Sequence, residues 1–155
     1  MRRGKLICTK GIGSTSEADN YYNPAFFVPC THFKNDSNMI KIDVNEQNEK
    51  MIFISGKEEK FCLKIKDITY IFGKGYMSEI HLVNGSTYSA MHLLKRIEEK
   101  LEKSKFFRTH RNVLINTEHF ICIRKTHNKR VVELNGGIVE ISRRKAALLK
   151  KIIWG

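Results

Sequence analysis

The stretch Phe106-Phe107-Arg108-Thr109-His110-Arg111-Asn112-Val113-Leu114-Ile115-Asn116 decides how this chain folds. Two aromatic residues come first, and a polar block with two arginines and a histidine follows. The aliphatic run at 113–115 predicts a buried strand. We therefore expect an exposed polar loop that is anchored to a core at both ends, which is a common setting for binding residues. Two interpretations are open: contact with the phosphates and base edges of a nucleic acid, or an ordinary basic turn.

Short β-rich runs lie on both sides of this stretch. They are bounded by turn signals, among them two hairpin signals at Asn84-Gly85 and Asn135-Gly136-Gly137. Gly73-Lys74-Gly75 is expected to end a strand, and residues 76–78 to continue that loop. The predicted strands are residues 61–65, 68–72, 79–83, 120–123, 130–134 and 138–141.

Two helices are expected. Leu93, Leu94, Ile97 and Leu101 lie at helical spacing and predict an amphipathic helix of roughly three turns that serves as scaffold. Ser142 is a suitable N-cap for a last helix, whose inward residues we expect to be Ala147, Leu148 and Ile152. Helices and strands alternate too rarely for a parallel sheet. The prediction is a mainly β (α+β) fold, an elongated antiparallel β-sheet domain with one central helix and a short C-terminal helix.

Residues 1–50 are expected to form an N-terminal arm or linker, and residues 51–155 the domain. Residues 39–44 alternate and could form a strand. The aromatic segment 21–28 is interpreted either as an arm that packs on the domain or as a self-association surface. An N-terminal phospho-receiver domain needs a longer α/β segment with an acidic cluster, so we expect none in residues 1–50.

The charge of the chain favours a polyanionic partner. The chain of 155 residues has a net charge of +12, and nearly all of this excess lies after residue 50. Nucleic acid is the first candidate and an anionic membrane the second, while the alternative is a generally basic, solvated surface. Arg143-Arg144-Lys145 stand at the expected helix start, where the helix dipole disfavours cations. Contact with phosphate would explain them.

The sequence gives little support for a membrane protein, a metal-binding protein or an enzyme. The chain has no apolar run long enough for a membrane helix or a signal peptide, so a cytoplasmic location is expected. Its four cysteines are scattered without a C-x-x-C pair, and Cys62 and Cys122 are interpreted as reduced, buried residues. The six histidines and the acidic residues form no hydrolase or nuclease motif. We expect no enzyme activity, no metal and no cofactor.

From about residue 51 to 153 the chain resembles the LytTR DNA-binding domain of bacterial response regulators and related transcription factors. Its F-x-R-x-H-R-x-x-x-(I/V)-N pattern, followed further on by S-R-R, is specific. The resemblance rests on Ile68-Thr69-Tyr70-Ile71, Leu82 with Asn84-Gly85, the four leucine and isoleucine positions of the predicted helix, the stretch 106–116, Leu134-Asn135-Gly136 and Ile141-Ser142-Arg143-Arg144.

This resemblance implies a transcription regulator whose loops enter successive major grooves of double-stranded DNA, on repeated sites and with a possible homodimer or regulatory protein partner. In the family, contacts come from the loop after the early strand, from the position after the motif histidine and from the S-R-R segment. The candidate DNA-binding residues implied here are Lys74, Tyr76, Met77, Arg108, His110, Arg111, Arg143, Arg144 and Lys145.

Within this set, Arg111 is expected to enter the groove, whereas Arg108 and His110 are expected to orient the loop. Better-known members carry a basic or imidazole side chain near the position of Tyr76 and a small polar one at that of Arg111. Because of these two departures, the resemblance implies DNA binding but not the operator sequence of those members. The alternative function is a basic RNA- or protein-interaction module without sequence-specific binding of duplex DNA.

Overall fold

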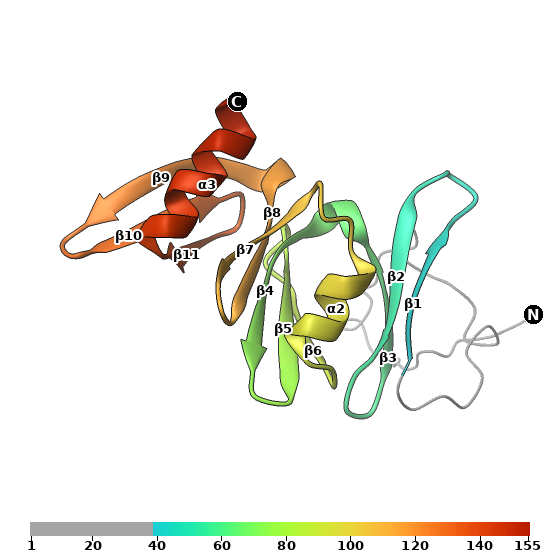
Figure 1. Ribbon diagram of the computed structural model, residues 1–155. Helices are drawn as coiled ribbons and strands as arrows, with labels where there is room; N and C mark the ends of the chain where they lie inside the picture. Colours follow the sequence, from blue (N-terminus) through green and yellow to red (C-terminus); the bar gives the residue numbers. More distant parts are fainter. Residues whose placement is uncertain (1–38) are drawn as a thin grey trace, which may run out of the picture. The chain divides into compact units, whose positions relative to one another are not determined.

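In the computed structural model, residues 39–155 are described, and Ile40–Gly155 form one compact unit (Figure 1). The first sheet has the order β1-β2-β3, with β1 at Ile40–Val44, β2 at Lys50–Ser55 and β3 at Lys60–Lys64. Since β1 pairs along its whole length with β2, this strand belongs to the folded unit, and the unit begins before the expected boundary at residue 50. The predicted aromatic segment at 21–28 lies outside the described residues.

The second sheet is central and has the order β6-β5-β4-β8-β7. All of its neighbouring strands are antiparallel. Its strands are β4 (Ile68–Lys74), β5 (Met77–Leu82), β6 (Thr87–Ala90), β7 (Phe106–His110) and β8 (Val113–Asn116).

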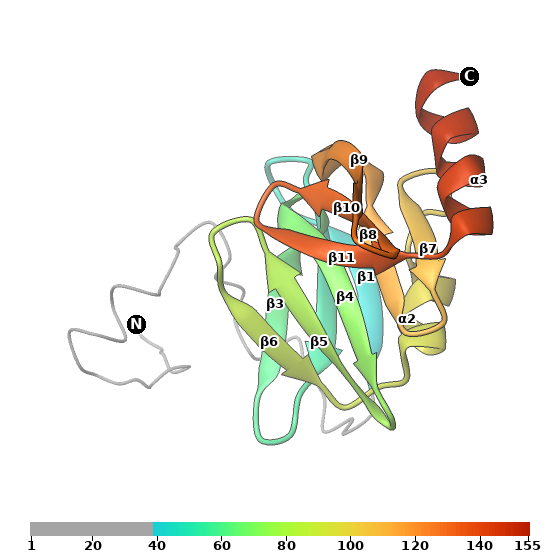
Figure 2. The ribbon, with the colours of Figure 1, turned by 90° about the vertical axis from the view of Figure 1, so that its left-hand side faces the viewer.

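The third sheet has the order β11-β10-β9, and helix α3 follows directly from its last strand (Figure 2). The strands are β9 (Phe120–Thr126), β10 (Lys129–Leu134) and β11 (Gly137–Ile141). The helices are α2 (Leu94–Lys100) and α3 (Arg143–Trp154), with two short 3-10 turns at Ile65–Asp67 and Thr117–His119. The mainly β fold with a short central helix and a C-terminal helix is confirmed.

Strand β8 joins two hydrophobic cores, because alternate side chains of a strand point to opposite faces of the sheet. Leu114 lies in the core formed with β2, β3 and α2, whereas Val113 and Ile115 lie in the core formed with β10, β11 and α3. All four residues of β8 are buried. The apolar run predicted as a buried strand is therefore the shared wall of both cores.

Three local expectations were wrong. The central helix has seven residues and leaves Leu93 half-exposed. Asn84-Gly85 predicts a two-residue hairpin turn, but the β5–β6 connection spans residues 83–86, with Gly85 at φ +90°. Helix α3 buries Ala146 and Leu149, while the expected Leu148 and Ile152 are 43% and 55% exposed.

Candidate nucleic-acid interface

The β4–β5 hairpin carries the first group of candidate residues. The expected loop at 73–78 is instead a tight turn, since Gly73 pairs with Ser78 and Lys74 with Met77. Gly75 has a φ of +64°, a conformation that glycine adopts without a steric cost. Beside it, Tyr76 is 70% exposed at the tip of the hairpin. The ladder therefore presents this tyrosine at the end of a rigid element.

Lys74 and Met77 are less available than Tyr76. The ammonium of Lys74 donates a hydrogen bond of 2.7 Å to Oε1 of Glu79 and forms an ion pair with it. Met77 is half-buried at the start of β5. Any anion that approaches Lys74 must compete with the carboxylate of Glu79.

The deciding stretch 106–116 is a β-hairpin rather than an exposed loop. Strands β7 and β8 pair antiparallel, with a register shift near Thr109, and only Arg111 and Asn112 form the turn. Thr109 is fully buried. The pairing was missed because the polar block looks like a loop, whereas the strand buries Thr109 and leaves Arg108 and His110 half-buried.

Arg108 is held by the protein itself. Its guanidinium forms an ion pair with Glu98 of α2 and also donates to the backbone carbonyl oxygen of Arg111. Its Nε–H donates to the carbonyl oxygen of His110 at 3.3 Å. These bonds tie the turn to α2, so the geometry gives Arg108 a positioning role.

His110 is tied to the same turn. Its Nδ1 donates to Oδ1 of Asn112 at 2.7 Å. The backbone carbonyl of Asn112 in turn accepts from the N–H of Gly73 at 2.7 Å. This last bond joins the β7–β8 turn to β4, close to the tip of the β4–β5 hairpin. The first two groups of candidate residues therefore lie at the same end of the central sheet.

Helix α3 carries the third group. The N–H of Ser142 donates to the carbonyl oxygen of Thr109 at 3.4 Å, which places the start of α3 beside β7. The hydroxyl of Ser142 accepts from the N–H of Lys145 at 3.3 Å, so Ser142 is the N-cap. The ammonium of Lys145 lies 5.4 Å from the ring centroid of Phe107, within the range of a cation–π contact.

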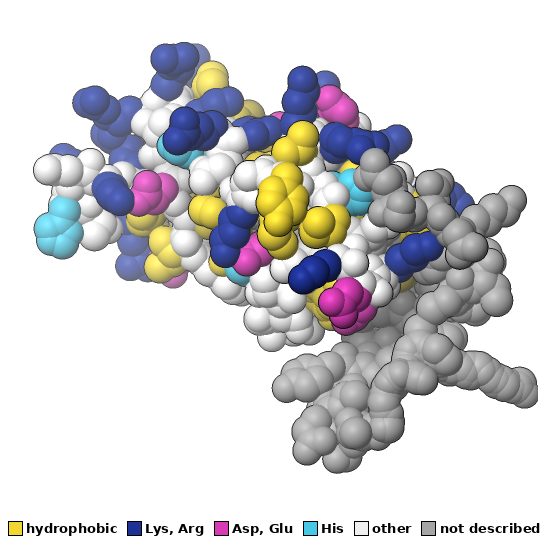
Figure 3. All heavy atoms as spheres, turned by 90° about the horizontal axis from the view of Figure 1, so that it is seen from below, with side chains coloured by type: hydrophobic (Ala, Val, Ile, Leu, Met, Phe, Trp, Pro, Cys, Tyr) yellow, Lys and Arg dark blue, Asp and Glu magenta, His cyan; other side chains and the backbone are white. Residues whose placement is uncertain are grey.

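The arginines in the β7–β8 turn and at the start of α3 are available for an external anion. Arg111, Arg143 and Arg144 are exposed. Within residues 39–155, their side chains have no ion pair or hydrogen bond with another residue. The first turn of α3 has no acidic residue to offset its cations. In the view from below, lysine and arginine side chains lie around a central hydrophobic area, with a few acidic side chains among them (Figure 3).

A cleft of about 550 Å³ lies between the central sheet and β11. Lys74 and His110 line it, together with Glu140 of β11. It therefore connects the first two groups of candidate residues with the strand that leads into α3. Sequence reasoning missed Glu98 and Asn112, because an acidic residue on a scaffold helix and an asparagine in a turn carry no signal of their own.

The described part of the chain offers little for other chemistry. Residues 39–155 contain no group of three or more histidine, cysteine or acidic side chains that could hold a metal ion. None of their helices is long and apolar enough to cross a membrane. Cys62 and Cys122 are free thiols that are half-buried, and burial raises the pKa of Cys62 to about 12.

Comparison with known proteins identifies the class. The sequence model of the LytTr DNA-binding domain matches residues 58–154, and the chain belongs to this family. It is a family of DNA-binding domains of transcription regulators and not of enzymes. No curated protein matches the chain in sequence.

A solved structure shares the fold. It is the LytTr DNA-binding domain of a putative methyl-accepting/DNA response regulator from Bacillus cereus. The TM-score is 0.57 at 20% sequence identity, over 68% of this chain and 97% of that one.

Proposed function

We propose that this chain is a sequence-specific transcription regulator that reads major grooves through Arg111 and through Arg143 and Arg144 at the start of α3. The observation that carries this proposal is the contrast between the arginines. The protein uses Arg108 to hold the β7–β8 turn, whereas the other three are exposed without an ion pair in residues 39–155. Arginine pairs in bidentate fashion with O6 and N7 of guanine.

The two kinds of contact have different effects. Lysines and arginines that neutralise phosphates release counterions, so affinity falls steeply with salt for any duplex. Contacts with base edges distinguish one sequence from another. The rigid turns suit the second task, because Arg108 holds the backbone of Arg111 and Ser142 holds the start of α3. Tyr76 stands at the neighbouring hairpin tip and is proposed to contact the same DNA.

The proposal is tested with Arg111→Ala and Arg144→Ala. A duplex is first selected by the protein from a random library, and binding to it is compared with binding to a random-sequence duplex. Each variant is expected to lose about 1–3 kcal/mol on the selected duplex and much less on the random one. Unchanged affinities of both variants on both duplexes would contradict the assignment.

Lys57→Ala is a matched control, because Lys57 is exposed in the β2–β3 turn, outside the three groups of candidate residues. The alternative, a basic module for RNA or protein, is tested in the same assay with single-stranded RNA as competitor. Displacement by RNA at concentrations where duplex DNA has no effect would favour that alternative. Binding to repeated half-sites as a homodimer, a further part of the proposal, predicts stepwise or cooperative shifts on duplexes with two half-sites.

A further inference from the structure

The β9–β10 hairpin carries four cations near its tip. Two lie on each face of the third sheet, and the two faces differ in whether these cations form ion pairs. Residues that pair across antiparallel strands point to the same face. Lys125 pairs with Arg130, and Ile123 pairs with Val132. Val132 is buried in the core that contains Ala146 and Leu149 of α3. Lys125 and Arg130 therefore lie on the face of the third sheet that α3 covers, beyond the buried part.

The opposite face is neutralised by the protein. Arg124 forms an ion pair with Glu133, and Lys129 forms one with Glu140. Each of these two cations thus has a carboxylate on its own face of the sheet.

On the face of the third sheet that α3 covers, no carboxylate of residues 39–155 pairs with the two cations. In residues 39–155, neither Lys125 nor Arg130 has an ion pair or a side-chain hydrogen bond. Like charges directly opposite one another on neighbouring strands are destabilising. The hairpin keeps this pair although the same strands supply acidic partners on the other face, which indicates an anion from outside the protein.

The register places this pair beside the proposed DNA contacts. Arg130 pairs with Ile141, the last residue of β11. Ser142 and Arg143 follow at once, and α3 begins there. Figure 1 shows the β9–β10 hairpin extending past the start of α3. The register therefore places Arg130, with Lys125 opposite it, beside the end of β11 from which Arg143 and Arg144 follow in the chain.

We propose that Lys125 and Arg130 bind the phosphodiester backbone of duplex DNA outside the bases that are read, on the side of the site contacted by α3. This inference rests on the proposed function, since it extends the same interface. The contact is electrostatic and independent of sequence, because these side chains lie on a hairpin beyond the turns that carry Arg111 and Tyr76.

The test uses two double variants of the full chain with the same change of charge. Lys125→Gln with Arg130→Gln removes the proposed phosphate contacts. Arg124→Gln with Lys129→Gln removes the two paired cations on the opposite face of the same hairpin. Affinity for the selected duplex and for a random duplex is measured over a range of salt concentrations.

The first double variant is expected to reduce the slope of log affinity against log salt by about two units, at roughly 0.9 per phosphate. Its affinity is expected to fall by similar factors on both duplexes. The second double variant should leave the slope unchanged. An unchanged slope in the first variant, or equal reductions in both, would overturn the proposal.

Failure of this proposal is distinguishable from failure of the proposed function. If the wild type selects a duplex and Arg111→Ala loses that selectivity, the proposed function stands whatever the slopes of the hairpin variants. If the wild type binds no duplex, both fail together. Thermal unfolding of each variant checks the fold. If Arg130→Gln destabilises the protein, Lys125→Gln alone, at an exposed position, is expected to show about half of the slope change.

Discussion

At the scale of the residue, Glu98 allows a test of whether Arg108 positions the turn that carries Arg111. If only net charge mattered, removing this carboxylate would strengthen binding to DNA. Because Glu98 holds Arg108, which holds the turn of Arg111, we expect the opposite from Glu98→Gln on the selected duplex. The expected loss is about 1 kcal/mol, the upper range for a partly exposed ion pair.

The matched control for this prediction is Glu99→Gln, on the next residue of α2. Glu99 is exposed and has no ion pair within residues 39–155, so its loss should strengthen binding slightly or leave it unchanged. Fluorescence anisotropy with both duplexes measures the effect. Equal strengthening by both variants would mean that Arg108 does not position Arg111.

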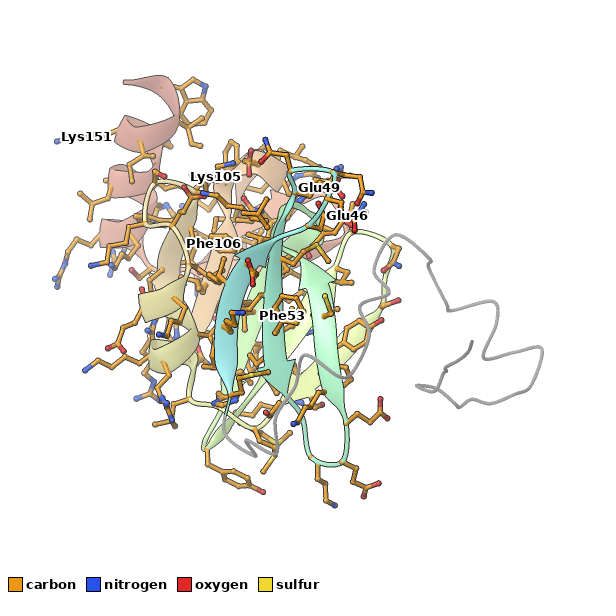
Figure 4. The ribbon with its side chains drawn as sticks, turned by 90° about the vertical axis from the view of Figure 1, so that its right-hand side faces the viewer. Glu46, Glu49, Phe53, Lys105, Phe106 and Lys151 are labelled. Atoms are coloured by element: carbon orange, nitrogen blue, oxygen red, sulfur yellow. The ribbon has the colours of Figure 1, made fainter. Side chains whose placement is uncertain are left out.

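Glu49 gives a prediction on stability that is separate from DNA. This carboxylate at the β1–β2 turn (Figure 4) forms ion pairs with Lys64, at 2.8 Å, and with Lys66. Hydrogen bonds from Lys64, Lys66 and Asn45 lower the pKa of Glu49 from 4.5 to about 2. A carboxyl group whose pKa is lower in the folded state stabilises the fold above its unfolded pKa, and this contribution is lost as the pH falls toward the folded pKa.

We therefore expect Glu49→Gln to lower the free energy of unfolding at neutral pH. The difference from the wild type should shrink as the pH falls from about 4.5 toward 2. Urea unfolding at a series of pH values measures it. A difference that stays constant across this interval would show that the ion pairs are not its source.

Single residues also show what the sequence can predict. Val113, Leu114 and Ile115 were recognisable as a buried strand because a continuous apolar run has few other solutions. The roles of Arg108 and Arg111 could not be separated in the same way. The difference lies in Glu98, ten positions away along the chain and in contact only through the fold.

At the scale of the element, the cations in the first turn of α3 are expected to destabilise the helix and to favour binding to DNA. Three cations stand where the helix dipole favours anions. We predict that Arg144→Glu raises the free energy of unfolding by about 0.3–1 kcal/mol at low ionic strength and weakens binding to every duplex. Chemical unfolding and DNA titration of the same samples measure the two effects. A loss of stability together with unchanged binding would contradict a functional origin of this charge pattern.

The existence of most helices and strands was predicted better than where each one ends and which of its faces is buried. Most strands and both helices were recognisable from periodicity, but β7 was predicted as a loop. For α3, the prediction placed the wrong face of the helix against the core. Its aliphatic positions 146–149 and 152–153 are compatible with more than one buried face. The face is settled by the start of the helix, where Ser142 is bonded to Thr109 of β7. That contact joins distant parts of the chain, so local pattern could not supply it.

At the scale of the whole molecule, the central sheet presents the two hairpin tips, and the third sheet presents the start of α3. The Gly73–Asn112 and Ser142–Thr109 hydrogen bonds connect these three groups. The membership of the family was recognisable in the sequence because its motif spans these same segments, and the match over 58–154 confirms it. We propose that the choice of bases depends on Tyr76 and Arg111, the two positions where the chain departs from the better-known members.

The central claim, that Arg111 reads guanine in a major groove while α3 contacts a neighbouring one, is tested most directly by methylation protection on the selected duplex. Protection of guanine N7 reports on major-groove contacts. We expect two groups of protected guanines about one helical turn apart, with one group lost in Arg111→Ala and the other in Arg144→Ala. Uniform protection, or a pattern that neither variant changes, would contradict the account.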